Sequence, residues 1–155
     1  MEAISDVLDA SCVSLDIQSK KKPDIIAELV QLLADAGKID NPDTITELVI
    51  QRESLMSTGI GGGIAVPHCL SRDINHTLIA FGRHLKGVKF DAVDKKPVQL
   101  FFLMVGPEGA QSDHLRLLSR LSRLLHDETL KTGLLEATTA EEVVELFYRR
   151  ENEGR

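Results

Sequence analysis

Residues 57–70 read STGIGGGIAVPHCL, and this stretch separates a helical pattern before it from strands after it. Glycine fills four of the five positions 59–63, so the backbone there can turn sharply and bring its N–H groups close to another group. Three apolar residues then predict a short strand, and Pro67 fixes the backbone just before His68. The same pattern also fits a plain flexible loop and a packed histidine.

Before this loop the sequence has helical spacing. Residues 4–8 predict a short first helix, and residues 12–15 alternate in the manner of a strand. Residues 23–37 form one broad apolar helical face that starts with a proline and ends with a glycine. Asn41 and the proline after it predict the start of a second long helix, which continues toward residues 52–53.

After the loop, strands come first and helices follow. Residues 77–85 predict a strand, and residues 88–106 predict a strand edge, a turn and a buried strand. Ser112 can cap a leucine-rich helix, a short helix is expected at residues 130–135, and the TAEE of residues 139–142 is a capping box before the last helix. Helices that precede, interrupt and follow the strands indicate an α/β fold with a mixed sheet and helices packed on it.

The length and composition indicate one globular domain. The chain has 155 residues, of which 43% are hydrophobic and 27% charged, so residues 1–155 are expected to form a single domain with a real core. The tail of residues 149–155 is expected to fray. A net charge of −6 argues against nucleic acid as a partner, because proteins that bind phosphate backbones usually carry clustered lysine and arginine.

Cysteine and histidine spacing exclude other classes of site. Cys12 and Cys69 are too few for a disulfide framework and fit no zinc pattern, so we expect a reducing compartment, the cytoplasm. No two of the five histidines are four residues apart, and we expect neither a metal nor a cofactor. The longest apolar run, residues 100–105, is far too short for membrane insertion, and the N-terminal residues do not resemble a signal peptide.

Several polar groups close to the loop in sequence can accompany His68. Arg52 ends the second long helix, and an arginine can grip a phosphate with two hydrogen bonds, although a solvated helix-end charge is the simpler interpretation. Ser57 and Thr58 carry hydroxyl donors that turn formation alone would also explain. Gly59, Gly61 and Gly62 can offer main-chain amides, but without a Walker A lysine they predict no nucleotide cradle.

A second histidine, His114, follows the expected cap Ser112 by two residues. A helix N-terminus disfavours a protonated imidazole and favours a nearby anion, so His114 is a candidate neutral donor, or else an ordinary first-turn residue. Imidazole is a competent covalent nucleophile, and phosphoryl transfer mainly requires positioning and charge stabilisation. The combination favours a site that holds a phosphoryl group on His68.

Motifs across the chain strengthen this interpretation. The stretch STGIGGGIAVPH, with QRES before it and FDAVDKKPVQLFFLMVGPEGAQSDHLRLLSRLSRLL after it, resembles the enzyme IIA domain of the fructose/mannitol/nitrogen-regulatory family. That family belongs to the bacterial phosphoenolpyruvate-dependent phosphotransferase system, and the resemblance extends from about Ser19 to about Phe147. It implies a mixed five-stranded sheet, phosphorylation of His68, and active-site roles for His114 and Arg52.

The resemblance also implies partners. Members receive phosphate from a histidine-containing phosphocarrier protein; sugar-type members pass it to a IIB domain, and regulatory members bind protein targets according to their phosphorylation state. Because no permease or IIB domain is fused to this chain, we expect the regulatory type. A sugar-specific component and a binding module of the same fold without phosphotransfer are the alternatives.

Two positions depart from the family pattern. Gly62 stands where the family usually has asparagine, which weakens loop rigidity but leaves the nucleophile in place. Cys69 replaces a small residue after the histidine, and its thiol raises the hypothesis of a redox-sensitive site. Buried thiols are commonly inert, which argues against that hypothesis.

Overall fold

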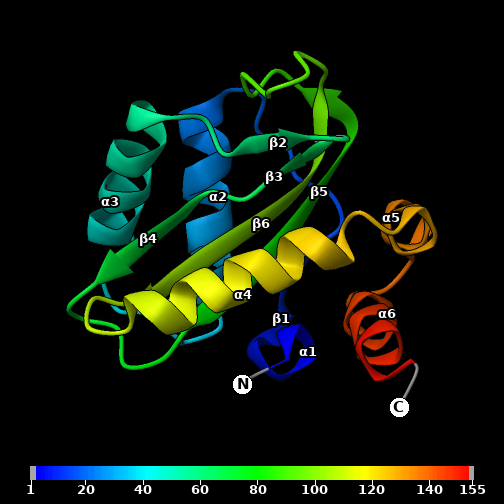
Figure 1. The fold of residues 1–155 in the computed structure, drawn as a ribbon. Coiled ribbons are helices and arrows are strands. Elements are labelled where there is room, and N and C mark those ends of the chain that lie inside the picture. Colours follow the sequence, from blue (N-terminus) through cyan, green and yellow to red (C-terminus); the bar gives the residue numbers. More distant parts are fainter. Residues whose placement is uncertain (1–2, 154–155) are drawn as a thin grey trace.

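The computed structural model describes residues 3–153 and has the expected α/β architecture of a mixed sheet flanked by helices (Figure 1). Its elements are α1 (Ile4–Val7), β1 (Leu8–Ser14), α2 (Lys22–Asp35), α3 (Pro42–Leu55), β2 (Gly59–Gly61), β3 (Ile64–Ala65), β4 (His68–Ser71), β5 (Leu78–Val88), β6 (Val98–Pro107), α4 (Gln111–Leu124), α5 (Glu128–Glu136) and α6 (Ala140–Asn152).

The sheet has the strand order β1-β5-β6-β3-β2, and β4 also pairs with β6. β5 runs antiparallel to β6 along one edge, while β3 and β4 run parallel to β6 along the other edge, one after the other. The sheet therefore has six strands rather than the five that the family resemblance implies, because β3 and β4 pair with β6 as separate segments. In this register His68 lies opposite Met104, and Cys69 lies opposite Val105.

Alternation along β6 divides the core into two layers. Phe101, Leu103 and Val105 pack with α2 and α3 on one face of the sheet. Leu100, Phe102 and Met104 belong to the other face, which α1, α4, α5 and α6 cover (Figure 1). Successive strand residues point to opposite faces of the sheet. Because helices cover both faces here, the central strand β6 is apolar throughout residues 100–105 rather than alternating.

Helix α4 starts earlier than the sequence pattern indicates. Its N-cap is Ala110 rather than Ser112, and the His114 N–H donates to the Ala110 carbonyl at 3.0 Å. His114 is therefore the fourth helical residue, and its main-chain N–H is already used. The predicted cap at Thr139 is confirmed, because its side chain accepts from the Glu142 N–H at 3.1 Å.

Helix α6 includes residues 149–152, part of the tail that was expected to fray. Glu151 in this last turn is only 8% exposed, and its carboxylate accepts from the Ile4 and Ser5 amides at 2.7 and 2.9 Å. Arg120 completes the contact with an ion pair at 2.8 Å. These contacts tie the end of α6 to the start of α1.

Candidate active site

His68 opens β4, directly after a break in the sheet edge at Pro67. The Pro67 carbonyl accepts from the Met104 N–H at 3.0 Å, so the proline is held against β6 although it lacks an N–H of its own. His68 is half-buried and Cys69 is fully buried in the α2 and α3 layer. Their side chains leave the strand in opposite directions, as expected for adjacent strand residues.

The backbone fixes which nitrogen of His68 carries the proton. Nδ1 lies 2.8 Å from the Val66 carbonyl oxygen, which can only accept a hydrogen bond. In the neutral ring, Nδ1 must therefore be the N–H, and Nε2 keeps its lone pair. An unprotonated Nε2 is the state that a nucleophile needs.

His114, on α4, lies against this ring. The two ring centroids are 5.5 Å apart and the planes are tilted by 50°. His114 is 6% exposed, and neither of its ring nitrogens has a hydrogen-bond partner among the residues that the structure describes. Buried polar groups are normally paired, so the unpartnered nitrogens make His114 a candidate contact for a ligand beside His68.

Both histidines are held neutral. Burial, and then the neighbouring His68, lower the pKa of His114 to about 4. Burial also lowers the pKa of His68, and the Arg52 charge acts in the same direction. The Val66 hydrogen bond and the Glu53 charge oppose this shift without reversing it. At neutral pH the site therefore holds two uncharged imidazoles.

Arg52 joins the two histidines in one pocket. The pocket has a volume of about 580 Å³ and lies between α3, β4 and α4. Arg52 and Gln51 line its α3 wall, and leucines form most of the rest. Leu55 and Leu115, two of those leucines, are 80% and 67% exposed, so an apolar rim surrounds the polar centre.

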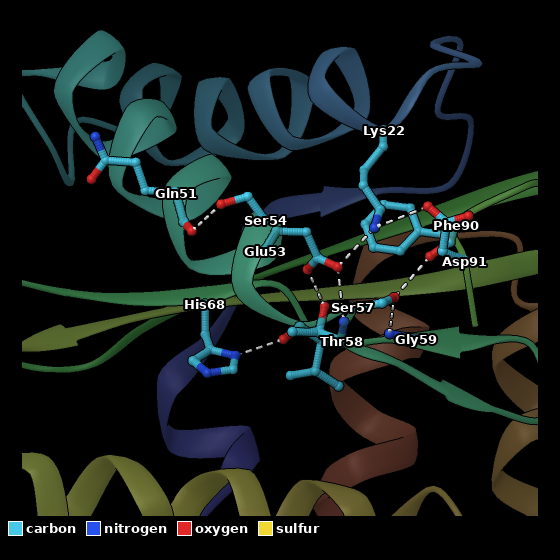
Figure 2. Close-up of polar contacts among 11 residues, drawn as sticks. Lys22, Gln51, Glu53, Ser54, Ser57, Thr58, Gly59, His68, Phe90 and Asp91 are labelled. Carbon is cyan, nitrogen blue, oxygen red and sulfur yellow. Dashed lines mark hydrogen bonds and ion pairs between the residues drawn. The ribbon is translucent and has the colours of Figure 1, made fainter. Parts of the chain in front are cut away.

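Ser57 and Thr58 are engaged within the protein (Figure 2). The Ser57 hydroxyl donates to the Phe90 carbonyl at 2.9 Å and accepts from the Gly59 N–H at 3.2 Å. Thr58 gives both its N–H and its hydroxyl to the Glu53 carboxylate, at 2.8 and 2.5 Å. The single hydroxyl proton of Thr58 is thus already donated.

The predicted loop residues lie outside the His68 pocket. Gly59 packs against Ala92, and the Gly62 N–H donates to the Asp94 carboxylate at 3.1 Å. Gly61 and Gly62 line a separate cavity of about 380 Å³. Within the described chain, neither the three glycines nor Ser57 and Thr58 line the pocket at His68. Their contact with phosphate stays a prediction.

The sequence pattern did not single out Glu53 or Lys22. Glu53 is 5% exposed near the end of α3, and the Lys22 ammonium lies 3.0 Å from its carboxylate. In sequence Glu53 is one more charged residue at a helix end, and Lys22 belongs to a run of three lysines typical of a solvated helix start. No local pattern distinguishes a buried charge from an exposed one.

Other features of the described residues concern metals, membranes and thiols. Residues 3–153 contain no group of three or more histidine, cysteine, aspartate or glutamate side chains that could hold a metal ion. No helix in that range combines the length and apolar character needed to cross a membrane. Burial raises the pKa of the Cys69 thiol to about 12, so it is not a thiolate near neutral pH.

Comparison with known proteins identifies the family of this chain. Residues 6–150 match the family described as "Phosphoenolpyruvate-dependent sugar phosphotransferase system, EIIA 2". A fructose-specific EIIABC component of Bacillus subtilis is 39% identical over 93% of this chain, which spans only 23% of that protein's length. A fructose-specific EIIA component of Haloferax volcanii is 35% identical, with 93% of this chain and 94% of that protein covered.

Solved structures support the same assignment. The nitrogen regulatory protein IIA-Ntr of Neisseria meningitidis has a TM-score of 0.86 and 33% identity, with 93% of this chain and 98% of that chain covered. IIA mannitol of Escherichia coli, at 24% identity and a TM-score of 0.76, covers 90% of this chain and 97% of its own, and shows the shared fold. The chain therefore belongs to the EIIA 2 family of the phosphoenolpyruvate-dependent sugar phosphotransferase system, whose members are phosphotransfer components.

Proposed function

We propose that this protein carries a phosphoryl group on Nε2 of His68. The observation that carries the proposal is the pairing of His68, whose Nδ1 proton is held by Val66, with His114, whose buried nitrogens have no partner in the described residues. A phosphoryl group on Nε2 brings oxygen acceptors into that pocket. The neutral His114 ring has one N–H to donate, and the Arg52 guanidinium supplies positive charge.

The reaction is a transfer between two imidazoles. The Nε2 lone pair of His68 forms a bond to phosphorus while the bond between phosphorus and the donor's histidine nitrogen breaks. The electrons of the broken bond return to the donor ring, and His68 needs no proton removed because Nε2 carries none. Positioning and charge stabilisation by Arg52 and His114 are then the protein's main contributions.

The donor in this proposal is a histidine-containing phosphocarrier protein in the cytoplasm. Its approach is favoured by the shape of the site, because His68 lies in a pocket rimmed by apolar side chains rather than deep in the core. The exposed Leu55 and Leu115 offer the apolar contacts that form the centre of protein interfaces. A phosphorylated small molecule as donor would not explain these exposed apolar side chains.

We propose a regulatory output for the phosphorylated state, supported by the 33% identity and the TM-score of 0.86 with IIA-Ntr. The two fructose-specific relatives, at 39% and 35% identity, support a second candidate, transfer from His68 to a IIB domain during sugar uptake. The two functions use the same phosphohistidine and differ only in the partner, which is a regulated protein target in one and a IIB domain in the other.

Phosphorylation itself is tested with purified components. Incubation with phosphoenolpyruvate, enzyme I and the phosphocarrier protein should add one acid-labile phosphate, detected by mass and by radiolabel. The His68→Ala variant should take up none, whereas His126→Ala, a change at an exposed histidine outside the pocket, should be labelled like the wild type. Full labelling of His68→Ala would refute the proposal.

The output is tested by giving the phosphorylated protein a fructose-type IIB domain. Rapid movement of the label to the IIB domain would assign the sugar-specific function and overturn the regulatory one. Retention of the label, together with a protein target that binds the phosphorylated form and His68→Ala with different affinities, would support regulation.

A further inference from the structure

Glu53 is a buried carboxylate that faces three donors. The Thr58 N–H donates to one of its oxygens at 2.8 Å, and the Thr58 hydroxyl donates to the other at 2.5 Å. The Lys22 ammonium, 3.0 Å away, balances the charge (Figure 2). Burying a carboxylate is costly unless its hydrogen bonds and charge are satisfied, and here they are.

The hydrogen bonds continue from Thr58 to the ring of His68. The Thr58 carbonyl accepts from the Val66 N–H at 3.1 Å. The Val66 carbonyl in turn accepts from Nδ1 of His68 at 2.8 Å. A continuous chain of contacts therefore joins the Glu53 carboxylate to the imidazole, although Glu53 itself does not line the pocket.

Glu53 also follows Arg52 directly in the last turn of α3. Anchoring Glu53 to Lys22 and Thr58 fixes this helix end, from which Arg52 reaches the pocket. One buried carboxylate thus connects two parts of the site, the guanidinium on α3 and the strand that presents the histidine.

We propose that Glu53 is a positioning residue for phosphoryl transfer, which acts through Thr58 and the Val66 backbone to hold His68 in the Nδ1–H tautomer. This inference rests on the proposed function, because it assumes that Nε2 of His68 is the atom that attacks. Holding the proton on Nδ1 keeps Nε2 free and keeps the ring aimed into the pocket. Loss of the anchor lets Val66 shift and weakens both constraints.

The first test needs no variant. Nitrogen-15 NMR of the His68 ring at pH 8 should show a protonated Nδ1 and an unprotonated Nε2. A ring with its proton mainly on Nε2 would overturn the inference, whatever the variants do.

The second test compares two substitutions that preserve shape. Thr58→Val removes the hydroxyl but keeps the hydrogen bond from the Thr58 N–H to Glu53. Glu53→Gln replaces an accepting oxygen with an amide N–H₂, which faces the Thr58 and Lys22 donors. Both should mix the tautomers and slow phosphorylation of His68 by roughly 10- to 100-fold, the range seen when outer partners of ligating histidines are removed. Thr58→Ser, which restores the hydroxyl, should recover the wild-type rate and spectrum.

Glu151→Gln is the matched control for a buried carboxylate. Glu151 also accepts two hydrogen bonds from the chain and pairs with a basic side chain, but it ties α6 to α1 and to Arg120 in the middle of α4, rather than α3 to the strand that presents His68. It should lose stability while keeping the His68 tautomer and the phosphorylation rate. If Glu53→Gln and Thr58→Val behave like this control, the positioning role is wrong. If His68→Ala still accepts phosphate, the proposed function itself fails.

Discussion

The rings of His68 and His114 lie 5.5 Å apart at the junction of β4 and α4, and His114 has no polar partner in the described part of the chain. A buried imidazole without a partner costs folding free energy. We interpret this cost as the consequence of a pocket built to receive a phosphoryl group, whose oxygens would satisfy His114.

Replacing His114 should slow transfer without abolishing it. Under the proposed function, His114→Ala removes a donor to the phosphoryl oxygens, and loss of one preorganised donor typically costs about 10²–10³ in rate. His114→Gln, which keeps an N–H, should recover part of the loss. Rates of label uptake from the phosphocarrier protein measure the effect. A wild-type rate in His114→Ala would show that the second histidine has no role in transfer.

Phosphoryl acceptance should persist in mildly acidic solution. The pKa of His68 is lowered from its ordinary 6.5, so the ring stays neutral and nucleophilic below the pH at which a free histidine is half protonated. Arg52→Gln removes a positive charge that lowers this pKa, so the fall in acceptance should begin at a higher pH. NMR titration of the His68 ring measures its pKa in the wild type and in Arg52→Gln. Identical titration curves would exclude a charge effect of Arg52.

Stability should also depend on pH through His114. Its folded-state pKa is about 4, against 6.5 for the ordinary group, so between these values the unfolded chain binds the proton and the folded protein does not. Stability must therefore fall as pH falls through this window, by at most roughly 3 kcal/mol. Urea unfolding at pH 7 and pH 4.5 should show a smaller fall for His114→Gln than for the wild type. An equal fall would mean that carboxylates alone cause it.

Cys69 should be unreactive in the folded protein. With a pKa of about 12, its thiolate fraction at pH 8 is about 10³-fold below that of an ordinary thiol. Alkylation by iodoacetamide should be correspondingly slow in buffer and fast in urea, as followed by mass spectrometry. Mild peroxide should leave phosphorylation of His68 unchanged. Loss of phosphorylation after peroxide treatment would revive the hypothesis of a redox-sensitive site.

Gly59 should not tolerate a side chain. A Cβ there would lie 2.7 Å from the Cα of Ala92, a backbone atom that cannot move aside cheaply. Overpacking of this kind typically costs about 1–3 kcal/mol, so Gly59→Ala should unfold at lower urea concentration. Gly109→Ala is the control, because nothing lies within 4 Å of the position of its Cβ. Equal stability of the two variants would contradict the crowding at Gly59.

Local patterns determined most of the architecture. The 3.6-residue spacing of residues 23–37 predicted α2, the capping box at Thr139 predicted α6, and the apolar run of residues 100–105 marked the central strand β6. The family resemblance, which rests on the Pro-His step and on the histidine of the leucine-rich helix, is confirmed by the family match. These signals depend only on residues that are close in sequence, so they can be recognised without the tertiary structure.

The sequence pattern predicts the cap of α4 at Ser112, two residues after the observed cap Ala110. A serine is a good cap in isolation, but the chain leaving β6 reaches helical geometry at Gln111. The direction of Thr58 toward Glu53, and the separation of Gly62 from His68, likewise depend on how α3 and the hairpin of β2 and β3 pack.

By itself the sequence determined most of the helices and the long strands, and it made His68 the candidate nucleophile, because hydrophobic period and turn chemistry are local properties. Only the tertiary structure decided that His114 meets His68, that the buried Glu53 accepts hydrogen bonds from Thr58, and that the glycine turn lines another cavity. Those relations are set by sheet register and helix packing, which join residues whose sequence separation carries no signal.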